Sequence, residues 1–216
     1  MRRATALVGV CLAGLLVAGA QAARSTVELT SEGVLEKEVA LGDLVADAIR
    51  EAGQAQVALV NATQFKPGDA VAAGKVTAGD VSALLVKPGR QWVVSQITGE
   101  CLKAALERSL SRCPSQSAHF LQVSGLKLTY DEKAGAGARI TSLTVDGKAV
   151  QNATTYRVAM PDDLAKGGSG YFTIPCFSES TIQPDATGTL ADAISAFLDA
   201  HATLEYGEPD RIVPAK

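Results

Sequence analysis

The sequence is poor in the residues that build metal and catalytic centres. Among its 216 residues there are only two histidines, His119 and His201. A site for two metal ions needs several histidine and carboxylate ligands, and zinc sites use cysteine and histidine spacings that this chain lacks. No Ser/His/Asp or Cys/His arrangement stands out either. We therefore predict no metal site and no catalytic residue, and we interpret Asp199-Ala200-His201 as a chance match in an amphipathic helix.

Long apolar runs are missing after the first 22 residues, so no membrane span is expected there. The N-terminus itself begins with the positive Met1-Arg2-Arg3, continues with an apolar run over residues 4–19 and ends with Ala20-Gln21-Ala22. That order of a basic start, an apolar stretch and a small-x-small site is typical of a cleaved secretory signal peptide. We predict a signal peptide over residues 1–22 and an exported protein, periplasmic or extracellular.

Positive charge is not in excess. The net charge is −3, and removal of residues 1–22 with their two arginines would leave 194 residues at −5. A mildly acidic protein binds nucleic acid and anionic membranes poorly, so neither is expected as a partner. The remaining length fits one domain with a substantial core.

Cysteine is scarce as well, and three remain after the predicted cleavage: Cys101, Cys113 and Cys176. Export makes a disulfide possible. Cys101 and Cys113 lie in or at the end of one predicted helix, about 18 Å apart by the helical rise, which is too far for a bond. Cys101 resembles a small core residue. If any pair forms, we expect Cys113 with Cys176.

The chain does contain alternating and helical apolar patterns that interleave irregularly. Apolar residues at helical spacing, with caps at Thr77, Thr98 and Thr189, predict helices from Asp43 to Gly53 and over residues 78–85, 100–110 and 190–200. Period-2 or continuous apolar runs predict strands over residues 57–60, 91–97, 120–123, 126–130, 140–145 and 156–160.

This order of elements predicts the α+β class. Residues 23–40 carry only short alternating runs and are expected to form a short hairpin or an extended arm. Residues 41–216 are expected to form a single domain with a mixed β-sheet flanked by helices.

A glycine-rich loop follows the last predicted strand. It reads Gly167-Gly168-Ser169-Gly170 and is closed by Tyr171-Phe172. Glycines allow positive φ angles and a close approach of the backbone, and a strand that ends in such a loop is a common place for a site. A plain tight turn is the alternative interpretation.

Eight short motifs, in order, make the chain resemble the C-terminal, substrate-binding domain of the 5′-nucleotidases. They are Leu41–Ala48 (LGDLVADA), Val57–Asn61 (VALVN), Gly74–Val81 (GKVTAGDV), Ile97–Leu102 (ITGECL), Phe120–Leu126 (FLQVSGL), Val145–Lys148 (VDGK), Thr155–Ala159 (TYRVA) and Gly167–Tyr171 (GGSGY). The resemblance covers about residues 40–172.

The resemblance implies a fold and a partner. Members of the family are two-domain hydrolases in which a calcineurin-like domain holds two divalent metals and attacks a phosphate with a metal-bound water. That catalytic domain is missing from this sequence, so the chain is expected to need a separate calcineurin-like phosphoesterase and to carry no cofactor itself. A small nucleotide or sugar is the ligand that the resemblance implies.

The resemblance also implies positions for ligand binding. Two aromatic rings hold the base in the family, and their positions here are occupied by Pro88 and Asp163. Ser169 replaces the usual aspartate of the glycine loop. Asn61 is retained, Thr63-Gln64 replace paired glycines, and Lys66 stands where an arginine is expected. The candidate ligand-binding residues are Asn61, Lys66, Arg90, Asp163, Gly167, Gly168, Ser169, Gly170 and Tyr171.

These replacements weaken the implied clamp. Stacking contributes about 1–3 kcal/mol per base, and neither Pro88 nor Asp163 can stack. Lysine at position 66 keeps the charge and loses the bidentate fork of arginine. Phe65 or Phe172 could compensate, whereas Trp92 is expected in the core. In the alternative interpretation Asn61 caps a strand end and the cations are solvated.

Two functions fit these observations. The first is a secreted domain that binds nucleotide-type ligands in nucleotide catabolism and depends on a separate metallophosphatase for hydrolysis. The alternative is a degenerate binding or scaffold domain of the cell envelope, with a non-nucleotide ligand or a protein partner.

Overall fold

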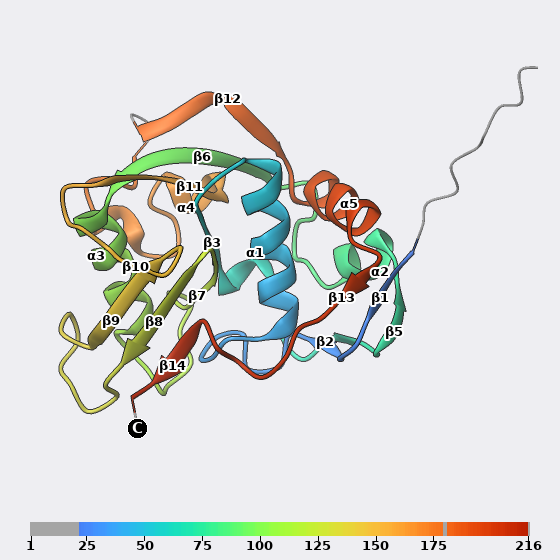
Figure 1. Ribbon diagram of the computed structural model, residues 1–216, viewed down its shortest axis with the longest axis horizontal. Coiled ribbons are helices and arrows are strands. Elements are labelled where there is room, and N and C mark those ends of the chain that lie inside the picture. The colour runs from blue at the N-terminus through green and yellow to red at the C-terminus, as the bar shows by residue number, and fades with distance from the viewer. Residues whose placement is uncertain (1–21, 179–180, 216) are drawn as a thin grey trace, which may run out of the picture.

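The centre of the molecule is a five-stranded mixed sheet. The computed structural model describes residues 22–178 and 181–215, so the predicted signal peptide lies outside the described residues except for Ala22. The strand order is β12-β6-β11-β3-β7 (Figure 1). Only β11 and β3 run parallel, and their neighbours pair antiparallel. The strands are β3 (Val57–Asn61), β6 (Gln91–Thr98), β7 (Leu121–Ser124), β11 (Thr155–Pro161) and β12 (Ile182–Thr189).

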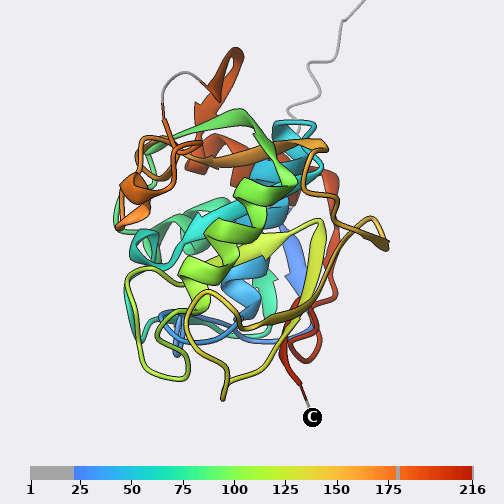
Figure 2. The same ribbon diagram turned by 90° about the vertical axis from the view of Figure 1, so that its left-hand side faces the viewer.

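Helices cover this sheet. The helix α1 (Ala40–Ala52) packs its buried apolar face on β3 and β7 and contacts α5 (Leu190–Ala200). The helix α3 (Gly99–Leu110) packs against β6, and Figure 2 shows it crossing the side turned away from α5. There are also two short α-helices, α2 (Ala78–Ala83) and α4 (Asp162–Ala165), and two 3-10 helices, Ala62–Gln64 and Tyr171–Thr173. Threonine caps at positions 77, 98 and 189 start α2, α3 and α5, because each hydroxyl accepts a backbone N–H.

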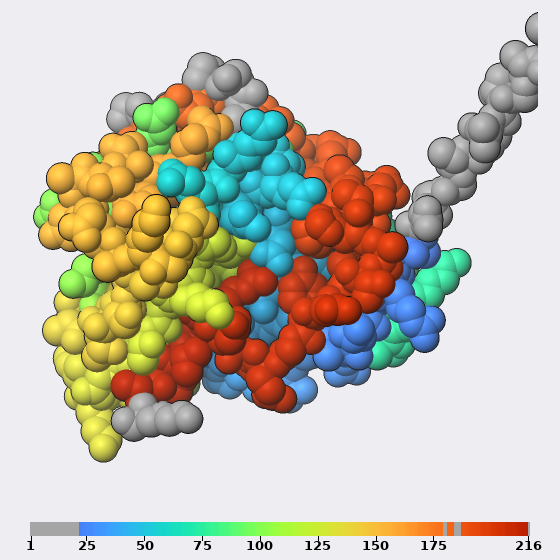
Figure 3. All heavy atoms as spheres, viewed as in Figure 1, coloured from blue at the N-terminus to red at the C-terminus, as the bar shows by residue number. Residues whose placement is uncertain are grey.

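Three smaller sheets surround the central one. The largest has the order β10-β9-β8-β14, and the others are β13-β1-β5 and β2-β4. Figure 3 shows the C-terminal segment running across one face, between strands β8 and β9 and the N-terminal residues. The strands are β1 (Ala23–Ser25), β2 (Leu29–Thr30), β4 (Ala70–Val71), β5 (Gly74–Val76), β8 (Leu126–Tyr130), β9 (Ile140–Val145), β10 (Lys148–Ala149), β13 (Thr203–Leu204) and β14 (Ile212–Pro214).

The α+β class with a mixed sheet and flanking helices is confirmed. The segment before α1 is packed into the fold: β1 pairs with β5 and β13, and β2 pairs with β4. A turn follows β2, in which the N–H groups of Glu36 and Lys37 donate to the carbonyl of Gly33. The helix α1 begins at Ala40, three residues before the predicted start. A hydrogen bond to a distant residue fixes the start of this helix, since the N–H of Val39 donates to Oε1 of Gln122 at 3.0 Å.

The predicted disulfide is wrong. Cys176 bonds to Cys101, with Cα atoms 6.3 Å apart, and Cys113 is a buried free thiol. The reason is the position of the chain after the glycine loop, which returns to the N-terminal end of α3 rather than to its C-terminal end. Cys101 is therefore not a plain core residue, and it fixes residues 171–176 to α3.

No helix within residues 22–178 and 181–215 has the length and apolar character needed to cross a lipid bilayer.

Candidate functional site at the carboxyl end of β3

The parallel pair β3 and β11 places the sequence-predicted residues at one edge of the central sheet. Val57 and Ala58 are in register with Val158 and Ala159. Because parallel strands end at the same edge, Asn61 at the end of β3 meets the segment that follows β11. That segment is α4 and then the glycine loop. The structure therefore brings Asn61, Asp163 and Ser169 together.

Asn61 is fully buried and lies at the centre of a hydrogen-bond cluster. Its amide nitrogen donates to the hydroxyls of Thr63 at 2.7 Å and Ser169 at 2.9 Å. Its amide oxygen accepts from Nε2 of Gln64 at 3.2 Å. A buried amide is stable only when its donors and acceptor are satisfied, and here protein groups satisfy them. Asn61 therefore holds the loops together.

Asp163 lies next to this cluster and is occupied on two sides. Nε2 of Gln64 donates to its two carboxylate oxygens at 3.1 and 3.2 Å. Arg90 approaches it at 3.9 Å and also contacts Asp162 at 3.4 Å. The side chains of Arg90 and Asp163 remain 24% and 29% exposed, so a ligand can still reach them. We name the group Asn61, Gln64, Arg90, Asp163 and Ser169 the β3-end cluster.

The glycine loop is shaped by close backbone contacts. Gly167 and Gly170 have φ angles of 86° and 82°. A Cβ at Gly170 would lie 2.8 Å from the side chains of both Arg108 and His119, so only glycine fits there. The N–H of Gly168 donates to the carbonyl of Asp163 at 2.7 Å and is not free for a ligand. Ser169 has a φ of 52°, which turns its hydroxyl toward Asn61.

Besides the three glycines of the loop, two predicted residues lie outside the cluster. Lys66 donates its ammonium to the carbonyl of Ala83 at 2.6 Å. Tyr171 is fully buried, and its hydroxyl donates to the carbonyl of His119 at 2.5 Å. Burial raises the pKa of the Tyr171 hydroxyl well above its usual range. Tyr171 is therefore a core residue that anchors the loop, and the ammonium of Lys66 binds the backbone of Ala83 rather than a residue of the cluster.

Sequence reasoning missed three neighbours of the cluster. Asp162 pairs with Arg90, and Arg108 and His119 lie beneath Gly170. Burial and the guanidinium of Arg108 hold the pKa of His119 below its usual range, so the imidazole is neutral at neutral pH. The only signal for Asp162 was its place beside Asp163. Arg108 and His119 lie on α3 and in the segment before β7, and no motif links them to the loop.

Of the three aromatic residues that could replace the missing rings, two are buried and one is exposed. Trp92 and Phe65 are buried in the core. Phe172 is 76% exposed. Within the described part of the chain, no group of three or more His, Cys, Asp or Glu residues is arranged to hold a metal ion.

Comparisons with known proteins bear on this geometry. Residues 18–178 match the family model for the 5′-nucleotidase C-terminal domain. The chain belongs to this family. The Thermus thermophilus 5′-nucleotidase precursor is similar in structure, with a TM-score of 0.76 and 27% identity over 90% of this chain. The trifunctional nucleotide phosphoesterase of Bacillus subtilis is 33% identical over 65% of this chain, and the apyrase of Aedes albopictus is 27% identical over 89%.

The 5′-nucleotidase C-terminal domain is only part of those relatives. This chain spans 10% of the Bacillus protein, 35% of the apyrase and 39% of the Thermus chain. At the position where the resemblance implies a stacking ring, this member of the family has Asp163, and Gln64 and Arg90 contact it. The place of the ring is filled by polar contacts within the chain.

Proposed function

We propose that this domain binds a nucleoside- or nucleotide-type ligand at the β3-end cluster, as an exported component of nucleotide catabolism. The proposal rests on the way in which polar residues from separate parts of the chain meet at one place. Asn61 ends β3, Arg90 directly precedes β6, and Asp163 and Ser169 belong to the segment after β11, so three separate segments meet at the carboxyl end of β3. Membership of the 5′-nucleotidase family supports a nucleotide as the ligand.

The chemistry of the cluster suits the sugar and the anionic part of such a ligand better than its base. A carboxylate such as Asp163 accepts hydrogen bonds from the hydroxyls of ribose. Arg90 can turn its guanidinium from Asp162, which it contacts at 3.4 Å, toward a phosphate. The two positions that carry base-stacking rings in the family hold Pro88 and Asp163 here, so the domain should discriminate poorly between bases.

Hydrolysis would depend on a second protein. A calcineurin-like phosphoesterase with two divalent metals would supply the attacking water, and this domain would present the ligand. The predicted signal peptide supports the periplasm or the extracellular space as the place of this reaction.

Calorimetry tests the proposal with adenosine, AMP and a UDP-sugar as probes. We expect millimolar or tighter binding that differs little between bases. Asp163→Asn should weaken nucleoside binding about tenfold, because one charged acceptor is lost. Arg90→Gln should weaken AMP about tenfold and leave adenosine unchanged. Lys66→Gln is the control, since the ammonium of Lys66 binds the carbonyl of Ala83 and contacts no residue of the cluster. Absence of heat with all three probes, or equal affinity of all variants, would exclude the proposal.

The alternative is a scaffold domain with a different ligand or a protein partner. It is favoured by the self-contained contacts of Asp163 and by the exposure of Phe172 and Val86, which are 76% and 51% exposed. A pull-down that retains a metallophosphoesterase, with phosphate release only in the mixture, favours the first function. A co-purified ligand without a nucleotide favours the alternative.

A further inference from the structure

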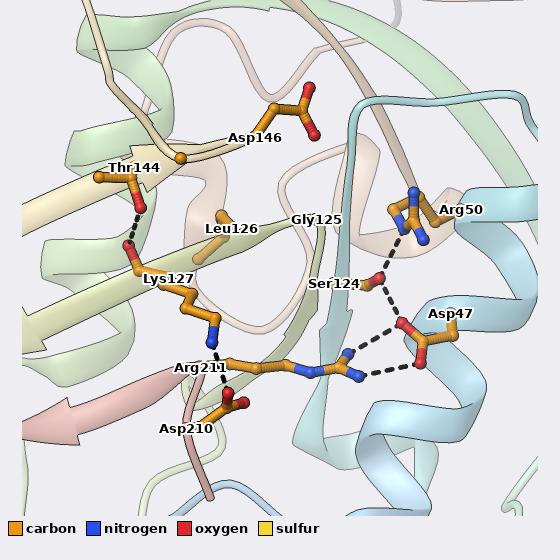
Figure 4. A pocket seen from close by; sticks show the side chains of 11 residues that line it. Asp47, Arg50, Ser124, Gly125, Leu126, Lys127, Thr144, Asp146, Asp210 and Arg211 are labelled. Atoms are coloured by element: carbon orange, nitrogen blue, oxygen red, sulfur yellow. Dashed lines mark hydrogen bonds and ion pairs between the residues drawn. The ribbon is translucent and has the colours of Figure 1, made fainter. Parts of the chain in front are cut away.

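A cavity lies at the opposite, amino end of β3. Ser124 pairs with Ala58 near the start of β3, whereas Asn61 ends that strand. The cavity has a volume of about 490 Å³, within the range of small-molecule sites. Figure 4 shows its side chains, which come from α1, the β7–β8 connection, β9 and the C-terminal segment. The lining includes Asp47, Arg50, Lys127, Asp146, Asp210 and Arg211.

One wall of the cavity is rigid because its charges are locked together. Arg211 donates from its two terminal nitrogens to the two carboxylate oxygens of Asp47, both at 2.9 Å. It also donates to the carbonyl of Val123 at 2.8 Å and lies 3.4 Å from Asp43. Such a bidentate pair fixes both side chains in one geometry. The Arg211 guanidinium is therefore not available to a ligand.

Arg50 is held by this wall but keeps free donors. Its Nε donates to the hydroxyl of Ser124 at 2.7 Å, and that hydroxyl in turn donates to Asp47. Among the residues that the structure describes, no group pairs with the two terminal nitrogens of Arg50. A guanidinium that is oriented through Nε and free at its other end is prepared for a carboxylate or phosphate.

The other side of the cavity offers one free negative charge. Asp146 has a φ of 49° and forms the turn between β9 and β10 with Gly147. In Figure 4 its carboxylate lies across the cavity from Arg50, and in the described part of the chain it has no hydrogen-bond or ion-pair partner. Lys127 and Asp210 pair with each other. The lining thus leaves one cation and one anion unpaired, on opposite sides.

We propose that this cavity binds a small zwitterion, such as a free amino acid or a short peptide. The anionic group of the ligand contacts Arg50, and its ammonium group contacts Asp146. A ligand with both charges pairs both protein groups at once, whereas an anion alone leaves Asp146 unpaired beside it. The proposal is independent of the ligand at the β3-end cluster, because the two places lie at opposite ends of β3.

Calorimetry with the full chain tests the site, using triglycine as the probe. N-acetyl-triglycine lacks the ammonium, triglycine amide lacks the carboxylate, and phosphoethanolamine offers phosphate instead of carboxylate. We expect triglycine or phosphoethanolamine to bind, and each probe with one charge to bind about tenfold more weakly. Arg50→Met and Asp146→Asn should each lower the affinity for the zwitterion about tenfold. Asparagine suits the positive φ of position 146, so that variant should fold.

Matched controls are Arg112→Gln and Asp199→Asn, two exposed side chains away from the cavity. They should leave the affinity unchanged. Amide resonances of residues 124–127 and 144–147 should shift on titration with the zwitterion, while those of Asn61 and Ser169 should not. Absence of binding by both zwitterions, binding unaffected by Arg50→Met, or equal binding of N-acetyl-triglycine and triglycine would each overturn the proposal.

Discussion

The two ends of strand β3 use the same kinds of side chain in different ways. At the carboxyl end, Arg90 contacts two carboxylates at 3.4 and 3.9 Å, and the polar groups are connected to one another. At the amino end, Arg211 makes a bidentate pair at 2.9 Å, and the neighbouring Arg50 keeps its terminal nitrogens free. The first end is a loosely paired network, and the second is a tightly paired wall beside an open cavity.

This difference separates two roles of charge in one fold. A tight, partly buried ion pair fixes the backbone around it, because loss of either partner leaves a charge without compensation. A looser and more exposed pair contributes less to stability and can exchange its partner for a ligand. The wall at the amino end should therefore matter for folding, and the cluster at the carboxyl end for binding. The following tests are ordered by expected size.

The largest effect is expected from Arg211→Met. It leaves the carboxylate of Asp47 without its bidentate partner, which should lower the free energy of unfolding by about 3–5 kcal/mol. Arg90→Met at the other end should lower it by about 1 kcal/mol or less. Urea unfolding at neutral pH measures both. Equal losses for the two variants would remove the distinction between the two ends.

A large effect is also expected from Gly125→Ala, in the β7–β8 connection that lines the cavity. A Cβ there would lie 2.0 Å from the carbonyl oxygen of Gln56, at a φ of 76°. We expect the free energy of unfolding to fall by about 3 kcal/mol, because the new Cβ both strains the backbone and displaces its neighbour. Gly137→Ala is the control. Gly137 has a φ of 88°, but no atom lies within 4 Å of an added Cβ. The free energy of unfolding should therefore fall by only about 1 kcal/mol, from the positive φ alone. Similar losses would show that the connection can move.

The wall should also make stability depend on pH through Asp43. Burial raises the pKa of this carboxyl from 3.8 to about 8, and the charges of Glu38 and Asp47 act in the same direction against the opposing Arg211. The unfolded chain loses this proton first, so between pH 4 and pH 8 the folded state binds more protons. Stability from this group therefore falls with rising pH, by at most about 1.4 kcal/mol per pH unit.

Asp43→Asn removes that titration. The variant should unfold at higher urea concentration than the unchanged protein at pH 8.5, and the difference should shrink toward pH 4.5. Denaturant midpoints at several pH values measure it. A constant difference across this range would show that Asp43 does not titrate as its burial requires.

The smallest effects compare two serines, one at each end of β3. Ser124→Ala removes the hydroxyl between Arg50 and Asp47 and should lower the free energy of unfolding by about 2 kcal/mol, since both partners are charged. Ser169→Ala removes a neutral partner of Asn61 and should lower it by about 1 kcal/mol. Thermal unfolding of the two variants, measured in parallel, shows which of them loses more stability. A larger loss at position 169 would mean that the β3-end cluster is the more rigid of the two.

Much of the fold follows from local pattern. The strands β3, β6, β8, β9 and β11 and the helices α3 and α5 lie close to their predicted bounds, because periodic apolar residues and threonine caps mark them. The strands of two or three residues could not be predicted, since so few residues show no period. The strand β12 contains Pro184 and Gly188, which argue against a strand in sequence, and its pairing with β6 shifts register.

The candidate site divides in the same way. Asn61, Asp163 and Ser169 were found from short motifs and do meet. Lys66 and Tyr171 were predicted from the same motifs but do not join the cluster. The ammonium of Lys66 binds the carbonyl of Ala83, and Tyr171 is buried in the core. A motif fixes where the backbone goes, while the direction of a side chain depends on what packs against it.

The sequence alone determined the family, the α+β class and the ends of the main elements, since these depend on local periodicity, caps and turns. Only the tertiary structure decided the contacts between distant segments. Cys101 bonds to Cys176 across 75 residues, and Arg211 reaches Asp47 across 164. Such pairs have no local signal, because they depend on how whole strands and helices pack. The open cavity beside Arg50 exists for that reason and could be seen only in the folded chain.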